Sequence, residues 1–450
     1  MINRLDKKDK HVNKQTIRFF ASFFYFLLIF LPLIVFILFP MPPGREFWRD
    51  FSVMLGFVGL SMAGMQFIPT ARLSFLSDVF DMDRVYKVHH LLSVLSVALV
   101  FAHPVILLVN NPFILMLLNP FNAPWGTQAG TIGLAGLVLI AITSVLRKEM
   151  KIDYDGWHII HDLLAAVIAV FALIHIFKVN YYTSYPAMKW AWILEAVIWG
   201  AMTVYMRIIK PTKMVQKSFT VKQIIEEAKD TWTLVLKPKG HSGFNFSAGQ
   251  VAWININSSP YSLNKNPFSI SGSAHNKGEL RFSIKKLGDF TSTIGKLAGG
   301  ETVYVDGPYG SFSLDDPITK SGLVLLAGGI GIAPIMSILY TLYDQGDNRP
   351  AYLFYGNLNE ESILFKEELD KLDQRMNLSV FHVLEKPANP GKNLQGFISR
   401  QILDSNLPPN RKDLFYFVCG PLPMIAAMEK HLSALDIPRK QINTEKYDMA

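Results

Sequence analysis

The chain has 450 residues, half of them hydrophobic, with a formal net charge of +8 and one cysteine, Cys419. A single cysteine excludes an internal disulfide, a thiolate-held iron–sulfur cluster and a covalent CxxCH haem attachment. No basic stripe interleaved with aromatic residues is present, so the positive charge gives no indication of nucleic-acid binding. The apolar residues are concentrated between positions 19 and 209, and the sequence beyond 211 is typical of a soluble protein.

The first 18 residues are polar and rich in lysine and arginine, and an apolar run follows at residues 19–39. This run is too long for the core of a signal peptide, and no small-residue cleavage site follows it. We therefore expect a cytoplasmic N-terminal segment over residues 1–18 and a retained first membrane span.

Six apolar segments are long enough to cross a bilayer, at about 19–39, 51–69, 86–109, 129–146, 158–178 and 189–207. Lysine and arginine cluster on one side of these segments, whereas the other side has only Arg45, Arg49, Lys178 and Lys189. The richer side is expected to be cytoplasmic. The sequence thus predicts a multi-pass α-helical domain over residues 19–210 of a cell-membrane protein, with both termini in the cytoplasm.

Four histidines lie in the third and fifth segments, and in each segment the second follows the first by 14 residues: His89 and His103, then His161 and His175. On a helix this spacing separates two side chains by about 21 Å and returns them to within about 40° of one face. Because both segments run from inside to outside, His89 and His161 share the inner leaflet, and His103 and His175 share the outer. Imidazole is a common axial ligand of haem iron, so the pattern predicts two non-covalent b-type haems.

The alternative is that these histidines only form hydrogen bonds between helices, and the doubled spacing argues against it. His90 and His158 do not share the spacing, since they fall about 140° and 100° off the common face. We expect these two side chains to lie at the membrane interface or beside a haem propionate.

From about residue 215 to 318 the sequence alternates short strands with turns, which is typical of a small antiparallel barrel. Within it, residues 266–270 place an aromatic ring next to a hydroxyl, which suits stacking on a flat ring system. At residues 285–291 a strand ends and a helix begins, which suits an anion. The residues expected to bind the cofactor are Pro267, Phe268, Ser269, Lys285, Gly288, Asp289, Phe290 and Thr291.

The order of these segments, with Gly249-Gln250 before them and the turn at 306–310 after them, resembles the flavin domain of the ferredoxin–NADP⁺ reductase superfamily. The resemblance implies that residues 211–318 bind FAD. The family usually has Arg or His where this chain has Asn266, and Lys285 aligns with a family arginine that would supply the charge.

The remaining sequence, residues 319–450, predicts an α/β nucleotide-binding domain. A buried-type strand at 323–327 runs into a glycine-rich turn and an apolar helix, which suits a pyrophosphate. With the later CGPLPM segment at 419–424, this turn resembles the NAD(P) domain of the same superfamily. The resemblance implies nucleotide binding by Gly328, Gly329, Gly331, Pro334, Gly420 and Pro421. It also implies a catalytic set of Cys419 near the nicotinamide, with Glu445 and Tyr447 against the flavin.

Six spans with paired histidines, followed by flavin and nucleotide domains, resemble the ferric reductase and NADPH oxidase (NOX) family over nearly the whole chain. The resemblance implies a transmembrane oxidoreductase that passes electrons from cytosolic NAD(P)H through FAD and two haems to an extracytoplasmic acceptor. The protein would lie in lipid, with its flavin and nucleotide domains in the cytoplasm.

The acceptor stays open between oxygen, which would give superoxide, and a ferric chelate. Superoxide-producing relatives carry a polar residue one turn beyond the outer histidine, where this chain has Leu107. Arg45 and Arg49 would attract an anionic acceptor, or simply lie at the interface. An alternative function is electron delivery to an extracytoplasmic partner protein docked on the outer loop 110–128. A transporter with a nucleotide sensor, which would contain no haem, is a third.

The nucleotide preference is also open. Residues 356–359 lack an arginine for a 2′-phosphate, which favours NADH slightly over NADPH. Later basic residues that would serve NADPH instead are Lys386, Lys392 and Arg400.

Overall fold

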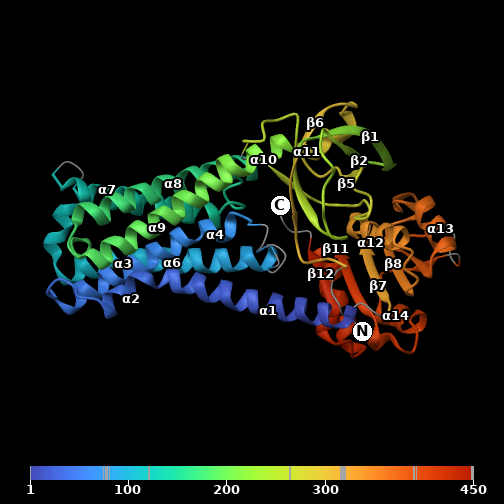
Figure 1. Ribbon diagram of the computed structural model, residues 1–450, viewed down its shortest axis with the longest axis horizontal. Helices are drawn as coiled ribbons and strands as arrows, with labels where there is room; N and C mark the ends of the chain where they lie inside the picture. The colour runs from blue at the N-terminus through green and yellow to red at the C-terminus, as the bar shows by residue number, and fades with distance from the viewer. Residues whose placement is uncertain are drawn as a thin grey trace. The chain divides into compact units, whose positions relative to one another are not determined.

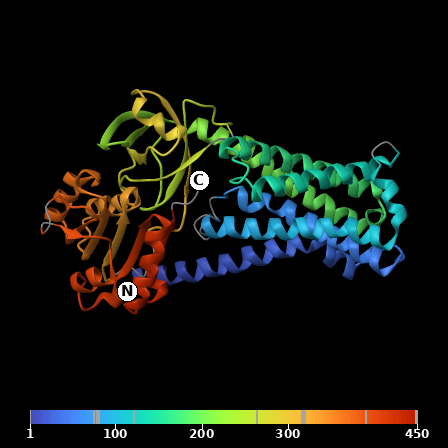
Figure 2. The same ribbon diagram turned by 180° about the vertical axis from the view of Figure 1, so that it is seen from behind.

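The computed structural model describes residues 2–73, 76, 80, 82–119, 122–262, 265–314, 321–388, 391 and 393–446. The chain divides into two compact units, a helical unit of residues 8–211 and a unit that begins at Thr212 and contains both β-sheets (Figures 1 and 2). A helical membrane part, an antiparallel barrel and an α/β domain follow one another along the chain. The predicted fold class is therefore confirmed.

Five helical stretches in the described residues are long and apolar enough to cross a membrane as single spans: Phe47–Thr70, Arg84–Asn110, Trp125–Val145, Tyr154–Val179 and Pro186–Gln216. They correspond to α3 (Phe47–Met65) with α4 (Phe67–Thr70), α6 (Met82–Asn110), α7 (Trp125–Val145), α8 (Tyr154–Val179), and α9 (Pro186–Val204) with α10 (Lys210–Gln216). The π-helical turn Tyr205–Ile209 joins α9 to α10.

The first span is broken into two helices, α1 (Ile2–Ile29) and α2 (Leu31–Leu38), whose apolar parts meet at 64°. Pro32 lies in the first turn of α2 and has no N–H, so it cannot continue the hydrogen-bond ladder of α1. The carbonyl of Leu28, four residues earlier, instead accepts the hydroxyl of Ser61 on α3 at 3.2 Å. The same hydroxyl lies 2.9 Å from Oε1 of Glu195 on α9.

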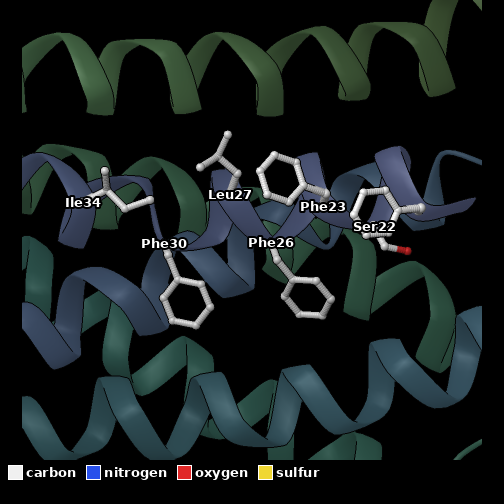
Figure 3. A pocket seen from close by; sticks show the side chains of 7 residues that line it. Ser22, Phe23, Phe26, Leu27, Phe30 and Ile34 are labelled. Carbon is white, nitrogen blue, oxygen red and sulfur yellow. The ribbon is translucent and has the colours of Figure 1, made fainter. Parts of the chain in front are cut away.

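A hollow of about 350 Å³ lies along the outer face of this broken span (Figure 3). Apart from Ser22, its lining is hydrocarbon from Phe19, Phe23, Phe26, Leu27, Phe30 and Ile34. Large exposed apolar side chains on a spanning helix are what a lipid-facing surface requires.

Glycines let the helices that carry the histidines approach a neighbour closely. A Cβ at Gly59 of α3 would lie 2.9 Å from the side chain of Leu99 on α6. On the next helix pair, a Cβ at Gly136 of α7 would lie 2.9 Å from Ile168 on α8. The opposite side of α3 contacts α9, where Gly64 lies against Trp199. Thus α6 packs on α3 and α8 packs on α7, and each histidine helix has its own supporting partner.

The first sheet is antiparallel, with strand order β4-β3-β6-β1-β2-β5. Its strands are β1 (Phe219–Ala228), β2 (Thr231–Pro238), β3 (Val251–Ile256), β4 (Asn266–Ser269), β5 (Leu280–Lys285) and β6 (Thr302–Tyr309). A bridge between Ile270, just after β4, and Phe282 of β5 joins the two edge strands and closes the barrel. The barrel core is a continuous apolar cluster that includes Phe219, Leu234 and Phe282.

The second sheet is parallel, with order β10-β9-β8-β7-β11-β12. Its strands are β7 (Leu323–Gly328), β8 (Ala351–Asn357), β9 (Leu378–Leu384), β10 (Leu394–Gln395), β11 (Phe415–Gly420) and β12 (Ile442–Lys446). One face is covered by α12 (Ile332–Asp344) and α13 (Lys366–Arg375), and the other by α14 (Arg400–Asn406) and α15 (Leu422–Ala434). The strand order reverses between β7 and β11, where such sheets bind nucleotides.

We expect Ser61→Ala to destabilise the membrane unit by about 1 kcal/mol, because two buried oxygens lose their shared partner. Thermal unfolding of the full-length protein in detergent measures this loss. Ser52→Ala is the matched control: Ser52 is equally buried on α3, but its hydroxyl donates locally to the carbonyl of Arg49 at 2.7 Å. Equal destabilisation by both substitutions would contradict the proposed bridge between helices.

Candidate functional site

The inner histidines face each other across the space between α6 and α8. The ring centres of His89 and His161 are 6.4 Å apart, and the ring planes are inclined by 69°. A first-row metal midway between two imidazoles, about 2.0–2.1 Å from each nitrogen and with each nitrogen about 1.1 Å from its ring centre, would separate the centres by about 6.3 Å. The observed spacing therefore fits one metal ion held axially by both rings.

The Nδ1 atom of His89 lies 3.1 Å from Oε1 of Gln66, the residue that caps the C-terminal end of α3. A carbonyl oxygen only accepts, so the neutral ring must carry its proton on Nδ1. The lone pair of Nε2 is then left for a ligand, as in most metal-binding histidines, whose second nitrogen is fixed by an outer hydrogen bond.

The same tautomer follows for His161 and His175 on α8. Nδ1 of His175 lies 2.8 Å from the carbonyl oxygen of Gly126, which only accepts. Nδ1 of His161 lies 3.3 Å from the hydroxyl of Ser144, and that hydroxyl already donates its proton to the carbonyl of Ile140. Both rings therefore donate from Nδ1 and leave Nε2 for a ligand.

The outer histidines each pack against a glycine of the supporting helix. A Cβ at Gly56 of α3 would lie 3.2 Å from the ring of His103, and a Cβ at Gly130 of α7 would lie 2.6 Å from Nδ1 of His175. Larger residues at the glycine positions would displace both rings.

The donor set suits haem iron rather than a bare metal ion. In the described part of the chain, His, Cys, Asp and Glu side chains form no group of three or more that would enclose a metal ion. A porphyrin supplies four nitrogens of its own, so a pair of histidines is sufficient at each depth.

The remaining histidines lie apart from these pairs. His158 stacks on Tyr154 with ring centres 5.9 Å apart, and its Nε2 is 3.9 Å from the carboxylate of Asp162. Asp162 also pairs with Arg207 in the π-helical turn after α9. His90 is exposed.

The sequence analysis missed several residues that contact the histidines or link the helices through polar groups: Gln66, Ser144, Glu195 and, through its backbone carbonyl, Gly126. Glu195 is wholly buried, and its Oε2 has no hydrogen-bond partner among the described residues. Polar side chains within apolar spans are costly, so Gln66 and Glu195 were detectable from sequence as candidates. Their partners were not.

At the predicted flavin site, the barrel brings β4 and α11 (Asp289–Ser292) together. The rings of Phe268 and Phe290 are stacked, with centres 5.9 Å apart and planes inclined by 21°. Pro267 and Ser269 flank Phe268 on β4, and Ser269 is buried. Two aromatic residues 22 positions apart thus form a stacked pair, and an aromatic ring of this kind suits contact with an isoalloxazine ring.

The hydroxyl of Thr291 occupies the loop that the sequence predicts to bind an anion. It accepts the backbone N–H groups of Leu287 and Gly288 at 2.8 and 2.9 Å. Two of the expected backbone donors are therefore already paired. Lys285 at the end of β5 and Asp289 at the start of α11 flank this loop.

The remaining motif residues of the barrel, Gly249 and Gln250, contact the segment that leaves the barrel after β6. Gly249 has a φ of +98°, and a Cβ there would lie 2.6 Å from the carbonyl oxygen of Phe312. The side chain of Gln250 accepts the N–H of Ser247 and donates to the carbonyl of Gly310. These residues therefore fix the backbone conformation at this point and do not contact a ligand directly.

The two glycine motifs of the nucleotide domain meet at the switch point of the sheet. A Cβ at Gly331 would lie 2.3 Å from the carbonyl oxygen of Cys419, and one at Gly328 would lie 2.3 Å from Sδ of Met424. A Cβ at Gly420 would lie 2.8 Å from the same sulfur. Only glycine permits this close packing of the ends of β7 and β11, the edge where such sheets bind a pyrophosphate.

The predicted catalytic residues are only partly brought together. Cys419 and Glu445 are direct neighbours in register on β11 and β12. Cys419 is wholly buried in the apolar cluster under α12. Pro334 is a buried residue of α12. Tyr447 lies outside the described residues.

Three family models match successive parts of the chain. The ferric reductase like transmembrane component matches residues 55–173, an FAD-binding domain matches 216–313, and the oxidoreductase NAD-binding domain matches 325–430. Together these matches reproduce the domain order of the ferric reductase and NADPH oxidase family. The predictions of this family, of a transmembrane part, and of an oxidoreductase with FAD-binding and NAD-binding domains are thereby confirmed.

Curated relatives of the chain include the NADH-cytochrome b5 reductase 1 of Laccaria bicolor. That protein is 34% identical over a match that covers 37% of this chain and 54% of the relative's own length. That of Dictyostelium discoideum is 30% identical over 40% of this chain and 63% of its own length. The chain thus spans little more than half of these relatives. Among solved structures, the FAD/NAD-binding domain of a Vibrio cholerae nitric oxide dioxygenase is 22% identical, with a TM-score of 0.46, and the match covers 51% of this chain and 98% of that one.

We expect Gly331→Ala to raise the KM for NADH at least about tenfold, because the new methyl group must displace the end of β11. Ferricyanide reduction by the full-length protein at varied NADH concentration measures this. Gly299→Ala is the control, since no atom lies within 4 Å of a Cβ there. FAD content, measured in both variants, reports whether the fold is retained. An unchanged KM at full FAD content would contradict a nucleotide site at this turn.

Proposed function

We propose that this protein carries electrons across a cell membrane, from NAD(P)H in the cytoplasm through FAD and two b-type haems to an acceptor on the far side. The observation that carries the proposal is the 6.4 Å separation of the His89 and His161 rings, which matches axial ligation of one metal. Three of the four predicted haem ligands also donate from Nδ1 and keep Nε2 for a ligand.

The protein's own groups would hold and orient these cofactors. Gln66, Ser144 and Gly126 fix the rings of His89, His161 and His175. Phe268 and Phe290 offer an aromatic surface to the flavin, and the glycine turns offer backbone N–H groups to the pyrophosphate. Bound flavin converts a two-electron donor into one-electron steps that haem iron accepts.

The orientation in the membrane follows from charge. The segments between α7 and α8 and after α9 are rich in lysine and arginine, which supports a cytoplasmic location for both termini and for the flavin and nucleotide domains. The electron source would then lie on the side of His89 and His161.

The terminal acceptor would be a small molecule, oxygen or a ferric chelate, that meets the outer haem edge. The outer rim has mixed charge. The Arg45 guanidinium lies 3.4 Å from the ring centre of Tyr181, and Asp50 bonds both the Arg45 amide and the Tyr182 hydroxyl. A ferric chelate reduced faster than oxygen would identify a ferric reductase, and the reverse order a superoxide producer.

A second candidate function, electron delivery to an extracytoplasmic partner protein, is favoured by the outer loop. In the 3₁₀-helix Pro112–Leu118, Phe113 and Met116 are 79% and 72% exposed, and Trp125 beyond it is half exposed. Such an apolar patch suits a protein surface. Negligible turnover of the purified protein on oxygen and ferric citrate, restored by outer proteins, would favour this candidate.

We expect His161→Ala to remove the absorbance of the inner haem at full protein yield, because that haem loses one of its two axial ligands. His158→Ala is the matched control, one turn earlier on α8, and it should retain both haems. Absorbance spectra of the purified oxidised and reduced proteins measure this. A His161→Ala protein with two haems would contradict the ligand assignment.

We expect NADH to be used with a kcat/KM about tenfold above that of NADPH. Glu360 follows β8, where the 2′-phosphate of NADPH would bind, and its carboxylate is fixed by the N–H of Ala388 at 3.0 Å. Steady-state rates with both nucleotides test this. Glu360→Gln should bring the two kcat/KM values closer together, because it removes a negative charge that would repel the 2′-phosphate. An NADPH preference in the native protein would contradict the prediction.

A further inference from the structure

We infer that Gln66 is a positioning residue that sets the proton position of His89 and lowers the reduction potential of the inner haem. The inference rests on the proposed function, since it concerns the haem ligands. It adds a role for a residue at the C-terminal end of α3 that is not itself a ligand.

The orientation of the Gln66 amide is fixed by its other contacts. Its Nε2 lies 3.1 Å from the backbone carbonyl of Met62 and 3.1 Å from the hydroxyl of Tyr25 on α1. The Met62 carbonyl has no proton to give, so the atom that faces it must be the NH₂ group. Oε1 is therefore the atom 3.1 Å from His89, and it can only accept.

This arrangement ties three helices to one imidazole. The side chain of Gln66, at the C-terminal end of α3, is 6% exposed. It links Tyr25 of α1 to His89 of α6. Both protons of the amide are committed, one to Tyr25 and one to Met62. A rotation that turned the NH₂ group toward His89 would break two hydrogen bonds in a buried site, at about 1 kcal/mol or more for each.

The inner and outer histidine pairs differ in these Nδ1 contacts. Both inner rings have an acceptor, Gln66 for His89 and Ser144 for His161. In the outer pair, His175 donates to the Gly126 carbonyl at 2.8 Å, which is shorter than either inner contact, and the buried Nδ1 of His103 has no hydrogen-bond partner of ordinary geometry among the described residues.

A ring that donates a hydrogen bond from Nδ1 gains electron density at Nε2, which makes it a more basic ligand. More basic axial ligands stabilise oxidised iron and lower the reduction potential. The acceptor at Gln66 would therefore lower the potential of the inner haem relative to the same site without it. Gln66 is the inner acceptor whose strength a single substitution can both remove and increase.

Redox titration of the purified full-length protein, with haem absorbance as the readout, tests the inference. Gln66→Met removes the acceptor at similar volume, and Gln66→Glu replaces it with a stronger one. Thr70→Val is the matched control, because the Thr70 hydroxyl donates to the backbone carbonyl of Gln66 at 2.8 Å and does not bond to His89.

We expect one of the two midpoint potentials to rise in Gln66→Met and the same one to fall in Gln66→Glu, while the other midpoint and both midpoints of the Thr70→Val protein stay unchanged. A tenfold change in the electron equilibrium between the haems corresponds to 59 mV for a one-electron couple. Opposite shifts are the decisive sign, because a residue that merely fills space would not move the potential in two directions.

Loss of one haem in Gln66→Met with retention in Gln66→Glu would also support the inference, since an acceptor rescues the site. Unchanged potentials in both variants, shifts of the same sign, or haem loss in both would overturn it. A native protein without haem would contradict the proposed function itself, before any Gln66 variant is measured.

Discussion

A neutral imidazole buried between membrane helices carries one N–H group, and that group must find an acceptor where no bulk water can serve. His89, His161 and His175 satisfy it with an amide, a hydroxyl and a backbone carbonyl on neighbouring helices. Each contact selects one tautomer and leaves the opposite nitrogen for a ligand. The proposed haem sites therefore depend on the supporting helices as much as on the histidines.

The supporting helices can supply these acceptors because glycine brings them close. Gly126 shows the principle most directly: its carbonyl accepts from His175, and a Cβ at the same position would lie 2.8 Å from the side chain of Lys178. On the other helix pair, Gly56 contacts the ring of His103. Without a hydrophobic driving force between helices in lipid, close packing of this kind is what holds such pairs together.

The sequence alone predicts the parts of this design that follow from periodicity. The shared inside-to-outside direction of the two histidine spans placed His89 and His161 at one depth, and their rings lie 6.4 Å apart between centres. The acceptors were not predictable, because Gln66 reaches His89 across 23 positions and Gly126 reaches His175 across 49. Local chemistry also changed one expectation, since the hydroxyl of Thr291 takes backbone N–H groups that the glycine turn suggested for an anion.

In the nucleotide domain, too, a local motif depends on contacts with a distant segment. Gly328 and Gly331 pack against Cys419 and Met424, which lie about 90 positions later in the sequence on β11 and α15. A glycine turn on its own leaves the backbone flexible, whereas a turn packed on a second strand end holds its N–H groups in one direction. In both units, then, a ligand-binding group becomes specific only when a distant segment removes its other conformations. This explains why the motifs identify the cofactors while the tertiary contacts determine how tightly each would be held.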